Sequence, residues 1–485
     1  QKMQGLGGVP QEGYIASRAE CRPPKSTGGF DKVYQAAGKT ADNLTPIDAV
    51  KFAAAYGTFI KNRNSTKDRI TVVIGRDARI SGKMISSLVA NTLVGLGIDV
   101  IDLGLSTTPT VEVAVPLENA EGGIILTASH NPKQWNALKL LNEKGEFLNG
   151  EDGEVILKTA ESDDFNFAEV DDLGSYSKDK TYLKKHIQEV LNLELVDVAA
   201  IRNANFKVVV DGVNSTGGIF IPALLKELEV ECIELYCEPN GQFPHNPEPL
   251  KEHLTDISEL VVKEQADVGI VVDPDVDRLA LVCEDGSMFG EEYTLVACAD
   301  YVLGKLGGGN TVSNLSSSRA LRDVTEKHGG TYTASAVGEV NVVIKMKETN
   351  TVIGGEGNGG IILPASHYGR DSLVGVALFL SHMATKKISC KALRESYPSY
   401  FMSKNKIQLT PQIDVDNILE IMATKYANEE VNTIDGVKID FESQWVHLRK
   451  SNTEPIIRIY TESNSQLNAD ELAERFITEI KEIIA

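Results

Sequence analysis

Short runs of apolar residues recur along the chain, and each is followed by a polar or glycine-containing segment and then by helical spacing. Residues 70–74, 206–210 and 268–272 are clear examples of these runs. Strands that alternate with helices are typical of α/β units with mixed or parallel sheets. The pattern therefore predicts several stacked α/β units.

The first helix has a clear start signal at residues 45–48, which read Thr-Pro-Ile-Asp. These residues are an N-cap, a proline at the first helical position and an early acid. Val50 and Ala54 share a helical face with Ile47, so these three residues form the predicted apolar face. A strand over 70–74, a helix over 81–96 and a strand over 98–103 should follow.

The last part of the chain has a different pattern, which predicts an antiparallel α+β layer. Its expected elements are a helix over 415–427, strands over 437–441, 445–448 and 456–460, and a helix over 469–484. Two earlier segments are also assigned. The acidic, irregular stretch over 161–177 is interpreted as the first linker. A helix is expected over 372–384.

Composition narrows the class of protein. A chain of 485 residues exceeds one ordinary core, and 42% hydrophobic content supports folding. The net charge of −21 and the lack of a long Lys/Arg run argue against nucleic acid or an anionic membrane as a partner. Six cysteines without Cys-x-x-Cys spacing, and no long apolar stretch or signal-peptide core, lead us to expect a cytoplasmic protein with free thiols.

One serine stands where a buried strand ends. The apolar run 123–126 leads into Thr-Ala-Ser-His-Asn-Pro at 127–132, and Asn-Pro favours a turn. Ser129 is therefore a candidate covalent phosphate carrier, with the His130 imidazole beside it. Taken alone, an ordinary polar turn is an equally good interpretation.

Three aspartates at alternate positions follow the run 268–272. Asp273, Asp275 and Asp277 offer hard oxygen ligands that suit Mg²⁺, and Arg278 follows them. A solvated acidic turn is one alternative. A calcium-binding EF-hand with Glu284 at position twelve is another, which we disfavour because Arg278 stands where that loop needs glycine.

Two further loops carry weaker signals. The glycine loop 354–360 contains Glu356 and Asn358, which can bind vicinal hydroxyls. The turn 449–455, with Arg458 after it, offers guanidinium and hydroxyl donors for a phosphate dianion. Common glycine turns and basic hairpins are the alternatives. The segment 211–218 lacks Gly-Lys-Ser/Thr, so we interpret it as a tight strand-to-helix connection rather than a phosphate cradle.

These four segments, in this order, resemble the phosphoserine, metal, sugar and phosphate loops of the α-D-phosphohexomutase superfamily. Secondary matches are the Gly-Arg-Asp of 75–77 with Arg79, Asn136 with Lys139, the segment 243–249, and Gly338. The resemblance covers residues 38 to 485, and residues before 38 are atypical. The residues of the glycine loop, Gly-Gly-Glu-Gly-Asn-Gly-Gly at 354–360, resemble those of the phosphoglucosamine mutase branch.

The resemblance implies three similar mixed α/β domains and a C-terminal α+β domain with an antiparallel sheet, arranged around a central cleft. The expected boundaries are 1–172 for the phosphoserine loop, 173–286 for the metal loop, 287–387 for the sugar loop and 388–485 for phosphate binding. It implies an isomerase that converts hexose 1-phosphates and 6-phosphates through a phosphoserine and a sugar 1,6-bisphosphate, which also serves as activator.

The resemblance also implies roles for individual residues. Lys139 is the expected acid/base, and Arg278 stabilises the transferred group. Gly338 belongs to the sugar-binding set with Glu356 and Asn358. The phosphate set comprises Arg449, Ser451, Asn452, Thr453 and Arg458. Ser129, once phosphorylated, completes the magnesium shell of the three aspartates.

Glucosamine phosphate is the favoured substrate, and a broad phosphomannomutase/phosphoglucomutase is the alternative. A magnesium-dependent phosphatase or kinase is a different class, although the chain has neither a P-loop nor a kinase signature. A non-catalytic phosphosugar-binding homologue is the third hypothesis.

Overall fold

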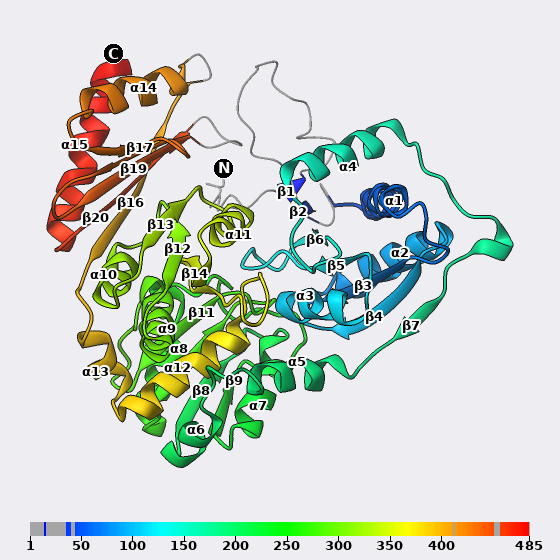
Figure 1. Ribbon diagram of the computed structural model, residues 1–485, viewed down its shortest axis with the longest axis horizontal. Helices are drawn as coiled ribbons and strands as arrows, with labels where there is room; N and C mark the ends of the chain where they lie inside the picture. The colour runs from blue at the N-terminus through cyan, green and yellow to red at the C-terminus, as the bar shows by residue number, and fades with distance from the viewer. Residues whose placement is uncertain (1–13, 16–34, 40–43, 411–412, 451–455, 485) are drawn as a thin grey trace, which may run out of the picture.

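The computed structural model describes residues 14–15, 35–39, 44–410, 413–450 and 456–484. The structure contains four β-sheets, three of them mixed and the last entirely antiparallel (Figure 1). The predicted fold class is confirmed. Among the described residues, no helix has the length and apolarity needed to span a membrane.

The first sheet has the strand order β1-β2-β6-β5-β3-β4-β7. Its strands are β1 (Tyr14–Ile15), β2 (Gln35–Lys39), β3 (Thr71–Arg76), β4 (Asp99–Leu105), β5 (Gly122–Leu126), β6 (Trp135–Leu141) and β7 (Tyr176–Lys178). Its helices are α1 (Pro46–Arg63), α2 (Gly82–Gly95), α3 (Thr108–Leu117) and α4 (Gly150–Ser162). Because β7 pairs with β4, this sheet extends past residue 172, where the sequence placed the first boundary.

Helix α1 begins as the sequence predicts, but its buried face differs from the predicted one. Thr45 and Asp48 form a reciprocal capping box, and Pro46 occupies the first turn. Ile47 is 78% exposed, whereas Phe52 and Ala54 are buried. The predicted face was therefore wrong at Ile47, because the apolar stripe begins two residues later, at Ala49.

The second and third sheets share one hydrophobic core. The second sheet has the order β11-β10-β8-β9 and the third β13-β12-β14-β15. Their strands are β8 (Lys207–Asp211), β9 (Glu231–Leu235), β10 (Val268–Val272), β11 (Leu279–Cys283), β12 (Asn310–Asn314), β13 (Tyr332–Ser335), β14 (Thr351–Glu356) and β15 (Gly360–Ile362). The joint core includes Phe289 and Phe379, whose rings pack edge to face at 5.1 Å.

Helices cover these two sheets and connect them. They are α5 (Tyr182–Leu191), α6 (Val198–Ala204), α7 (Gly217–Glu227), α8 (Thr255–Glu264), α9 (Glu291–Leu306), α10 (Ala320–Lys327), α11 (Glu339–Glu348), α12 (Ser372–Lys386) and α13 (Cys390–Glu395), with short 3-10 turns at Val170–Asp172 and Lys251–His253. The segment 211–218 is a tight connection from β8 into α7, as predicted.

The fourth sheet has its own core and lies at the upper left of Figure 1, far from α1 and α2. Its order is β16-β20-β19-β18-β17. The elements are β16 (Phe401–Gln408), β17 (Glu430–Asn432), β18 (Val437–Asp440), β19 (Trp445–Lys450), β20 (Ile456–Ser463), α14 (Val415–Lys425) and α15 (Gln466–Ile484). The Arg319 guanidinium, in the third unit, joins this sheet by donating to the carbonyl oxygens of Phe441, Glu442 and Gln444.

The described cysteines are free thiols: Cys232, Cys237, Cys283, Cys298 and Cys390. Cys283, Cys298 and Cys390 are buried, as expected.

Candidate active site

Ser129 lies at the end of the fully buried strand β5, in a constrained turn. Its backbone has φ +47°, a left-handed conformation that few non-glycine residues adopt. The side chain is buried, and Ser129 Oγ donates a hydrogen bond of 2.7 Å to Asp273 Oδ2. The predicted serine and the first predicted aspartate, 144 positions apart, are therefore in direct contact.

Arg79 holds the serine loop in shape. Its guanidinium donates to the carbonyl oxygens of Ser129 (2.5 Å), Asn131 (2.7 Å), Pro132 (2.8 Å) and Trp135 (2.9 Å). Asp77 orients this guanidinium through a 2.9 Å contact and also accepts from Thr127 Oγ1 at 2.8 Å. Sequence analysis found the Asp77–Arg79 segment only as a secondary match and missed this role.

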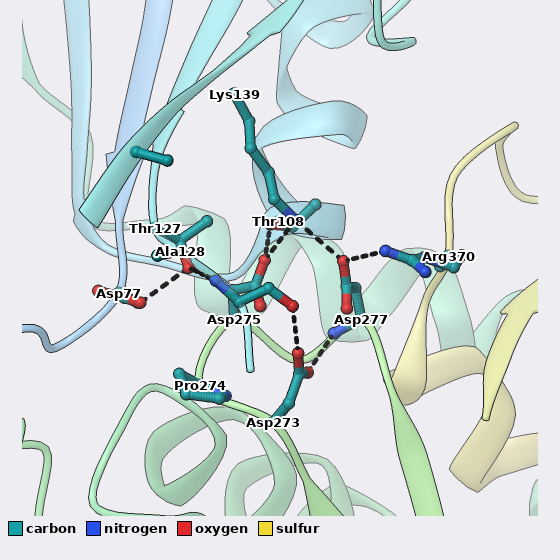
Figure 2. A network of polar contacts seen from close by, with 12 residues as sticks. Asp77, Thr108, Thr127, Ala128, Lys139, Asp273, Pro274, Asp275, Asp277 and Arg370 are labelled. Atoms are coloured by element: carbon teal, nitrogen blue, oxygen red, sulfur yellow. Dashed lines mark hydrogen bonds and ion pairs between the residues drawn. The ribbon is translucent and has the colours of Figure 1, made fainter. Parts of the chain in front are cut away.

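The three aspartates of the metal loop converge and are fully buried (Figure 2). One ligand oxygen from each of Asp273, Asp275 and Asp277 lies within 4.8 Å of the others. Asp275 Oδ1 and Asp277 Oδ1 have no hydrogen-bond partner within the described part of the chain. Because an unpartnered buried carboxylate oxygen is costly, these two oxygens, together with the Asp273 carboxylate, fit a hard divalent cation such as Mg²⁺.

The surroundings make the three carboxyl groups unequal. Burial and the two neighbouring aspartates hold the pKa of Asp273 well above its usual range. Burial alone would also raise the pKa of Asp277, but Arg370 and Lys139 lie close to it and lower that pKa below its ordinary value. A divalent cation would stabilise the ionised form of Asp273, the carboxyl group whose negative charge its surroundings destabilise.

Lys139 points from strand β6 into the aspartate cluster (Figure 2). Its Nζ lies 2.8 Å from Asp275 Oδ2 and 3.0 Å from Asp277 Oδ2, and the residue is fully buried. Lys139 therefore lies on a strand in the interior of the site, not on an exposed helix surface. These two ion pairs place the ammonium protons of Lys139 directly beside the carboxylates of the metal loop.

Neighbouring loops fix the backbone of the metal loop. Thr108, the first residue of α3, binds Asp275 Oδ2 through its hydroxyl at 2.5 Å and Asp275 O through its amide at 2.9 Å. The hydroxyls of Ser215 and Thr216 both donate to Pro274 O. The segment 211–218 thus supports the metal loop, and neither this nor the role of Thr108 was predicted.

His130 and Arg278 flank the serine. His130 Nδ1 lies 3.3 Å from Ser129 Oγ, while burial and Arg278 hold the pKa of His130 well below its usual range. The imidazole is therefore neutral at physiological pH. Arg278 is buried and lies 3.5 Å from Glu248 Oε1, within the 243–249 segment matched in the sequence.

Arg370 connects the metal loop with the glycine loop, and sequence analysis missed it. Its guanidinium lies 2.8 Å from Asp277 Oδ2, 2.7 Å from Glu356 Oε2 and 3.0 Å from Glu339 Oε2. The residue is fully buried. One cation therefore positions carboxylates from two of the predicted loops.

The glycine loop faces a pocket between the third and fourth units. Glu356 and Asn358 line this pocket, while Gly338 starts α11 and donates its amide to Glu356 Oε1 at 3.3 Å. Asn314 Nδ2 also donates to this oxygen, at 2.8 Å. A Cβ at Gly357 would lie 2.0 Å from Glu292 Oε2, so a side chain there would force the Glu292 carboxylate on α9 to move.

The fourth unit contributes cations to the same pocket. Arg449 and Arg458, both predicted, line it together with Lys404 and His447, which were not predicted. His447 Nδ1 lies 2.9 Å from Ser316 Oγ, and burial lowers the pKa of this imidazole to about 4. Ser451, Asn452 and Thr453 lie outside the described residues.

The calcium-loop alternative does not fit this geometry. Glu284 Oε2 accepts from the amide of Lys391 at 2.9 Å and is not part of the aspartate cluster. Its loop lies between strands β10 and β11, not between helices. The EF-hand interpretation is wrong.

Four family models match the chain in order. They describe phosphoglucomutase/phosphomannomutase alpha/beta/alpha domains I, II and III, over residues 30–167, 182–286 and 290–400, and the C-terminal domain, over 406–479.

Curated relatives match over almost their whole length. A phosphoglucomutase/phosphomannomutase of Thermococcus kodakarensis is 35% identical over 92% of this chain and 97% of its own. A probable phosphoglucosamine mutase of Methanopyrus kandleri is 30% identical over 92% and 96%. The crystal structure of a phosphoglucomutase/phosphomannomutase family protein from Burkholderia thailandensis superimposes with a TM-score of 0.81 at 26% identity, covering 92% of this chain and 96% of that one.

Proposed function

The chain belongs to the phosphoglucomutase/phosphomannomutase family of phosphohexomutases, which are isomerases, and we propose that Ser129 is its phosphate carrier. The observation that supports this most directly is the 2.7 Å contact between Ser129 Oγ and Asp273 Oδ2. A phosphate on Ser129 would border the carboxylate cluster that fits Mg²⁺ and the ammonium of Lys139.

In the proposed transfer, the phosphate on Ser129 is regenerated in every reaction cycle. The substrate's free hydroxyl attacks the phosphorus of phospho-Ser129, forming a new O–P bond as the Ser129 Oγ–P bond breaks. Lys139, in its neutral amine form, accepts the hydroxyl proton, and a proton is returned to Ser129 Oγ as its bond to phosphorus breaks, so that no proton is gained or lost overall. The product of this half is a hexose 1,6-bisphosphate, which then returns its other phosphate to Ser129.

We propose Asp273, Asp275 and Asp277 as the magnesium ligands. A bound Mg²⁺ would neutralise negative charge on the transferred phosphoryl group. Arg278 adds a guanidinium at the same end of the site, and His130, being neutral, can exchange a hydrogen bond with Ser129 without adding charge.

We propose that the pocket between the third and fourth units holds the rest of the sugar phosphate. Arg449 and Arg458, with Ser451, Asn452 and Thr453, form the phosphate set, while Glu356, Asn358 and Gly338 form the hydroxyl set. Hydroxyls O3 and O4 are present in both substrate orientations. A site that hydrogen-bonds to them can therefore bind the sugar with either O1 or O6 directed at Ser129.

For the substrate, we propose glucosamine phosphate first, with glucose and mannose phosphates as slower alternatives. Relatives named phosphoglucosamine mutase and phosphoglucomutase/phosphomannomutase support both substrate classes, and the ranking between them is our proposal. The ion pair of Glu356 with Arg370 leaves only part of the Glu356 charge for a C2 ammonium. We therefore expect several-fold selectivity, consistent with about 1 kcal/mol from a screened pair.

We propose the boundaries 172/173, 286/287 and 387/388 for the four domains, and a reducing, cytoplasmic compartment in keeping with the free thiols.

The activity test uses metal-replete protein, glucosamine 1-phosphate and a trace of hexose 1,6-bisphosphate. Formation of the 6-phosphate supports the proposed mutase, whereas free phosphate would indicate a phosphatase. A panel of the three sugar phosphates ranks kcat/KM, and a tenfold preference for glucose or mannose phosphate would reverse the substrate order.

Ser129→Ala tests the carrier. This variant should lose nearly all mutase turnover and keep its melting temperature to within a few degrees, since Ala occupies the same turn. Peptide mapping of the wild type should find phosphate on Ser129. Phosphate found consistently on another residue would refute the assignment.

A further inference from the structure

A second group of metal-type ligands lies outside the aspartate triad, where three parts of the chain meet. His186 comes from α5, His367 from the loop before α12, and Asp371 is the N-cap of α12. One donor atom from each lies within 4.8 Å of the other two. His186 and Asp371 are buried, and the His367 side chain is 11% exposed.

The distances are close to those of a metal shell. His186 Nε2 lies 2.9 Å and His367 Nε2 lies 3.1 Å from the same oxygen, Asp371 Oδ2. Zinc–nitrogen bonds of about 2.0–2.1 Å in a tetrahedron place neighbouring ligand atoms about 3.3 Å apart. Each of the two imidazole nitrogens therefore needs to move only a few tenths of an ångström from Asp371 Oδ2 to reach this spacing.

The helix cap fixes the orientation of the carboxylate. Asp371 Oδ1 accepts hydrogen bonds from the amides of Leu373 (2.8 Å) and Val374 (3.3 Å) at the start of α12. Oδ2 is thereby turned away from the helix and toward the two imidazoles. This places the shared oxygen without any contribution from a bound ion.

The outer ring nitrogens face oxygen atoms, the usual second partners of metal-bound histidines, through a hydrogen bond for His186 and a longer contact for His367. His186 Nδ1 lies 2.8 Å from Thr110 Oγ1, and His367 Nδ1 lies 3.5 Å from Glu112 Oε2. Both oxygens belong to α3. If each imidazole carries its proton on Nδ1, each Nε2 lone pair points into the cluster.

Glu112 provides an independent sign that a cation is missing. It is buried, and neither of its carboxylate oxygens has a hydrogen-bond partner among the residues that the structure places. Gly369 leaves the space for this carboxylate, since a Cβ there would lie 1.9 Å from Glu112 Oε2. Two buried carboxylates, Glu112 and Asp371, thus adjoin two imidazoles, and a divalent ion would balance them.

A second histidine–aspartate cluster in the same chain differs because lysine side chains also contact its aspartate. Asp300 lies 2.8 Å from His328 Nε2 and 3.5 Å from His382 Nε2. Two ammonium groups also contact Asp300, Lys386 at 3.0 Å and Lys327 at 3.6 Å. Those lysines already supply positive charge, whereas the described ion-pair partners of Asp371 are the two imidazoles alone.

We propose that His186, His367 and Asp371 bind one divalent transition-metal ion of the zinc class. A water molecule completes a four-coordinate shell, and Thr110 and Glu112 orient the imidazoles. Two nitrogens and one oxygen suit such an ion, whereas the all-oxygen aspartate triad suits Mg²⁺. Because the ligands and their outer partners lie on α3, α5 and the loop before α12, the ion ties three of the chain's units together behind the metal loop.

The test measures bound zinc in the intact protein. Wild type is saturated with excess Mg²⁺, incubated with Zn²⁺, desalted and analysed by mass spectrometry for metal content. We expect one zinc per chain in wild type and in Asp275→Asn, and loss of that zinc in His367→Gln and in Asp371→Asn. The matched control His328→Gln, which alters the lysine-containing cluster, should keep the zinc.

X-ray absorption at the zinc edge of the wild type tests the site without any variant. Scattering from two imidazoles supports the proposal even if the histidine variants do not fold. An all-oxygen shell, no zinc in wild type, or zinc lost in Asp275→Asn but kept in His367→Gln would each overturn it. None of these measurements depends on the mutase activity or on the carrier role of Ser129.

Discussion

At the scale of single residues, a few buried charges are shared among several loops. Asp275, for example, contacts Thr108 from α3 and Lys139 from β6, and it leaves one oxygen without a partner. Changing such a residue alters the chemistry of the site and the packing of its neighbours together. Each prediction at this scale therefore needs a control that separates the two effects.

Asp275→Asn should weaken Mg²⁺ binding and lower kcat far more than KM, roughly a hundredfold, because the metal charge matters most in the transition state. Steady-state kinetics across a range of Mg²⁺ concentrations checks this. Exposed Glu429→Gln removes the same charge and should leave both constants unchanged. Equal losses in the two variants would argue against a metal role for Asp275.

Arg370→Ala should lower the free energy of unfolding by about 3–5 kcal/mol, since it removes the guanidinium from the buried carboxylate of Glu356 and leaves Asp277 with Lys139 alone. Urea titration gives this value. Arg69→Ala, which breaks an exposed ion pair with Asp99, should cost about 1 kcal/mol or less. A similar, small loss in both variants would show that Arg370 is not the central cation.

Residue types predicted some of these positions and not others. Ser129 and the three aspartates stand in short, unusual sequence segments that follow buried strands, so the local pattern predicted them. Arg370, Lys404 and Thr108 have ordinary neighbours, and their roles depend on partners that only the fold brings close. The face of α1 shows the same limit, because Ile47 fits the helical period but lies where no other element covers it.

At the scale of elements, the strand ends and helix starts position the site. Strand β5 ends at the serine loop, β10 at the metal loop and β14 at the glycine loop. Long periodic segments such as α12 and β10 were predicted within about two residues. Pairing between strands that are distant in sequence, such as β3 with β5, is not a local property and required the structure.

The start of α9 should make stability depend on pH. Burial raises the pKa of Glu292 from 4.5 to about 8. The folded protein therefore holds this proton more tightly than the unfolded chain. Its contribution to stability is complete below pH 4.5 and is lost as pH rises through 8.

We expect the free energy of unfolding to fall by at most about 1.4 kcal/mol per pH unit across this window because of Glu292. Glu292→Gln should remove that decline, as urea titrations at pH 5, 6, 7 and 8 would reveal. Exposed Glu420→Gln is the control and should keep the wild-type profile. An unchanged slope in Glu292→Gln would mean that this carboxyl group ionises normally.

At the scale of the whole molecule, one hydrophobic core is not confined to a single sheet. The second and third sheets share one core, whereas the fourth has its own. The alternation of apolar and polar segments predicted the number of units. It did not predict this sharing, because an apolar residue in α12 has the same pattern whichever sheet it covers.

Phe379→Ala should lower amide-exchange protection in both the second and the third sheets and leave the fourth unchanged. Phe379 lies in the shared core, and its truncation should cost about 3–5 kcal/mol. Phe476→Ala, in the core of the fourth unit, should have the reverse effect. Loss of protection confined to the third sheet in Phe379→Ala would show that the two sheets unfold independently.

The grip of Arg79 on the serine loop also bears on how this protein can be diversified. All four of those carbonyl oxygens belong to the main chain, which every amino acid carries. The guanidinium therefore maintains the loop conformation whatever side chains the loop displays. Libraries randomised at positions such as 130 and 133 should therefore contain a high fraction of folded variants. Such libraries would suit laboratory selection for transfer of phosphate to new acceptor molecules.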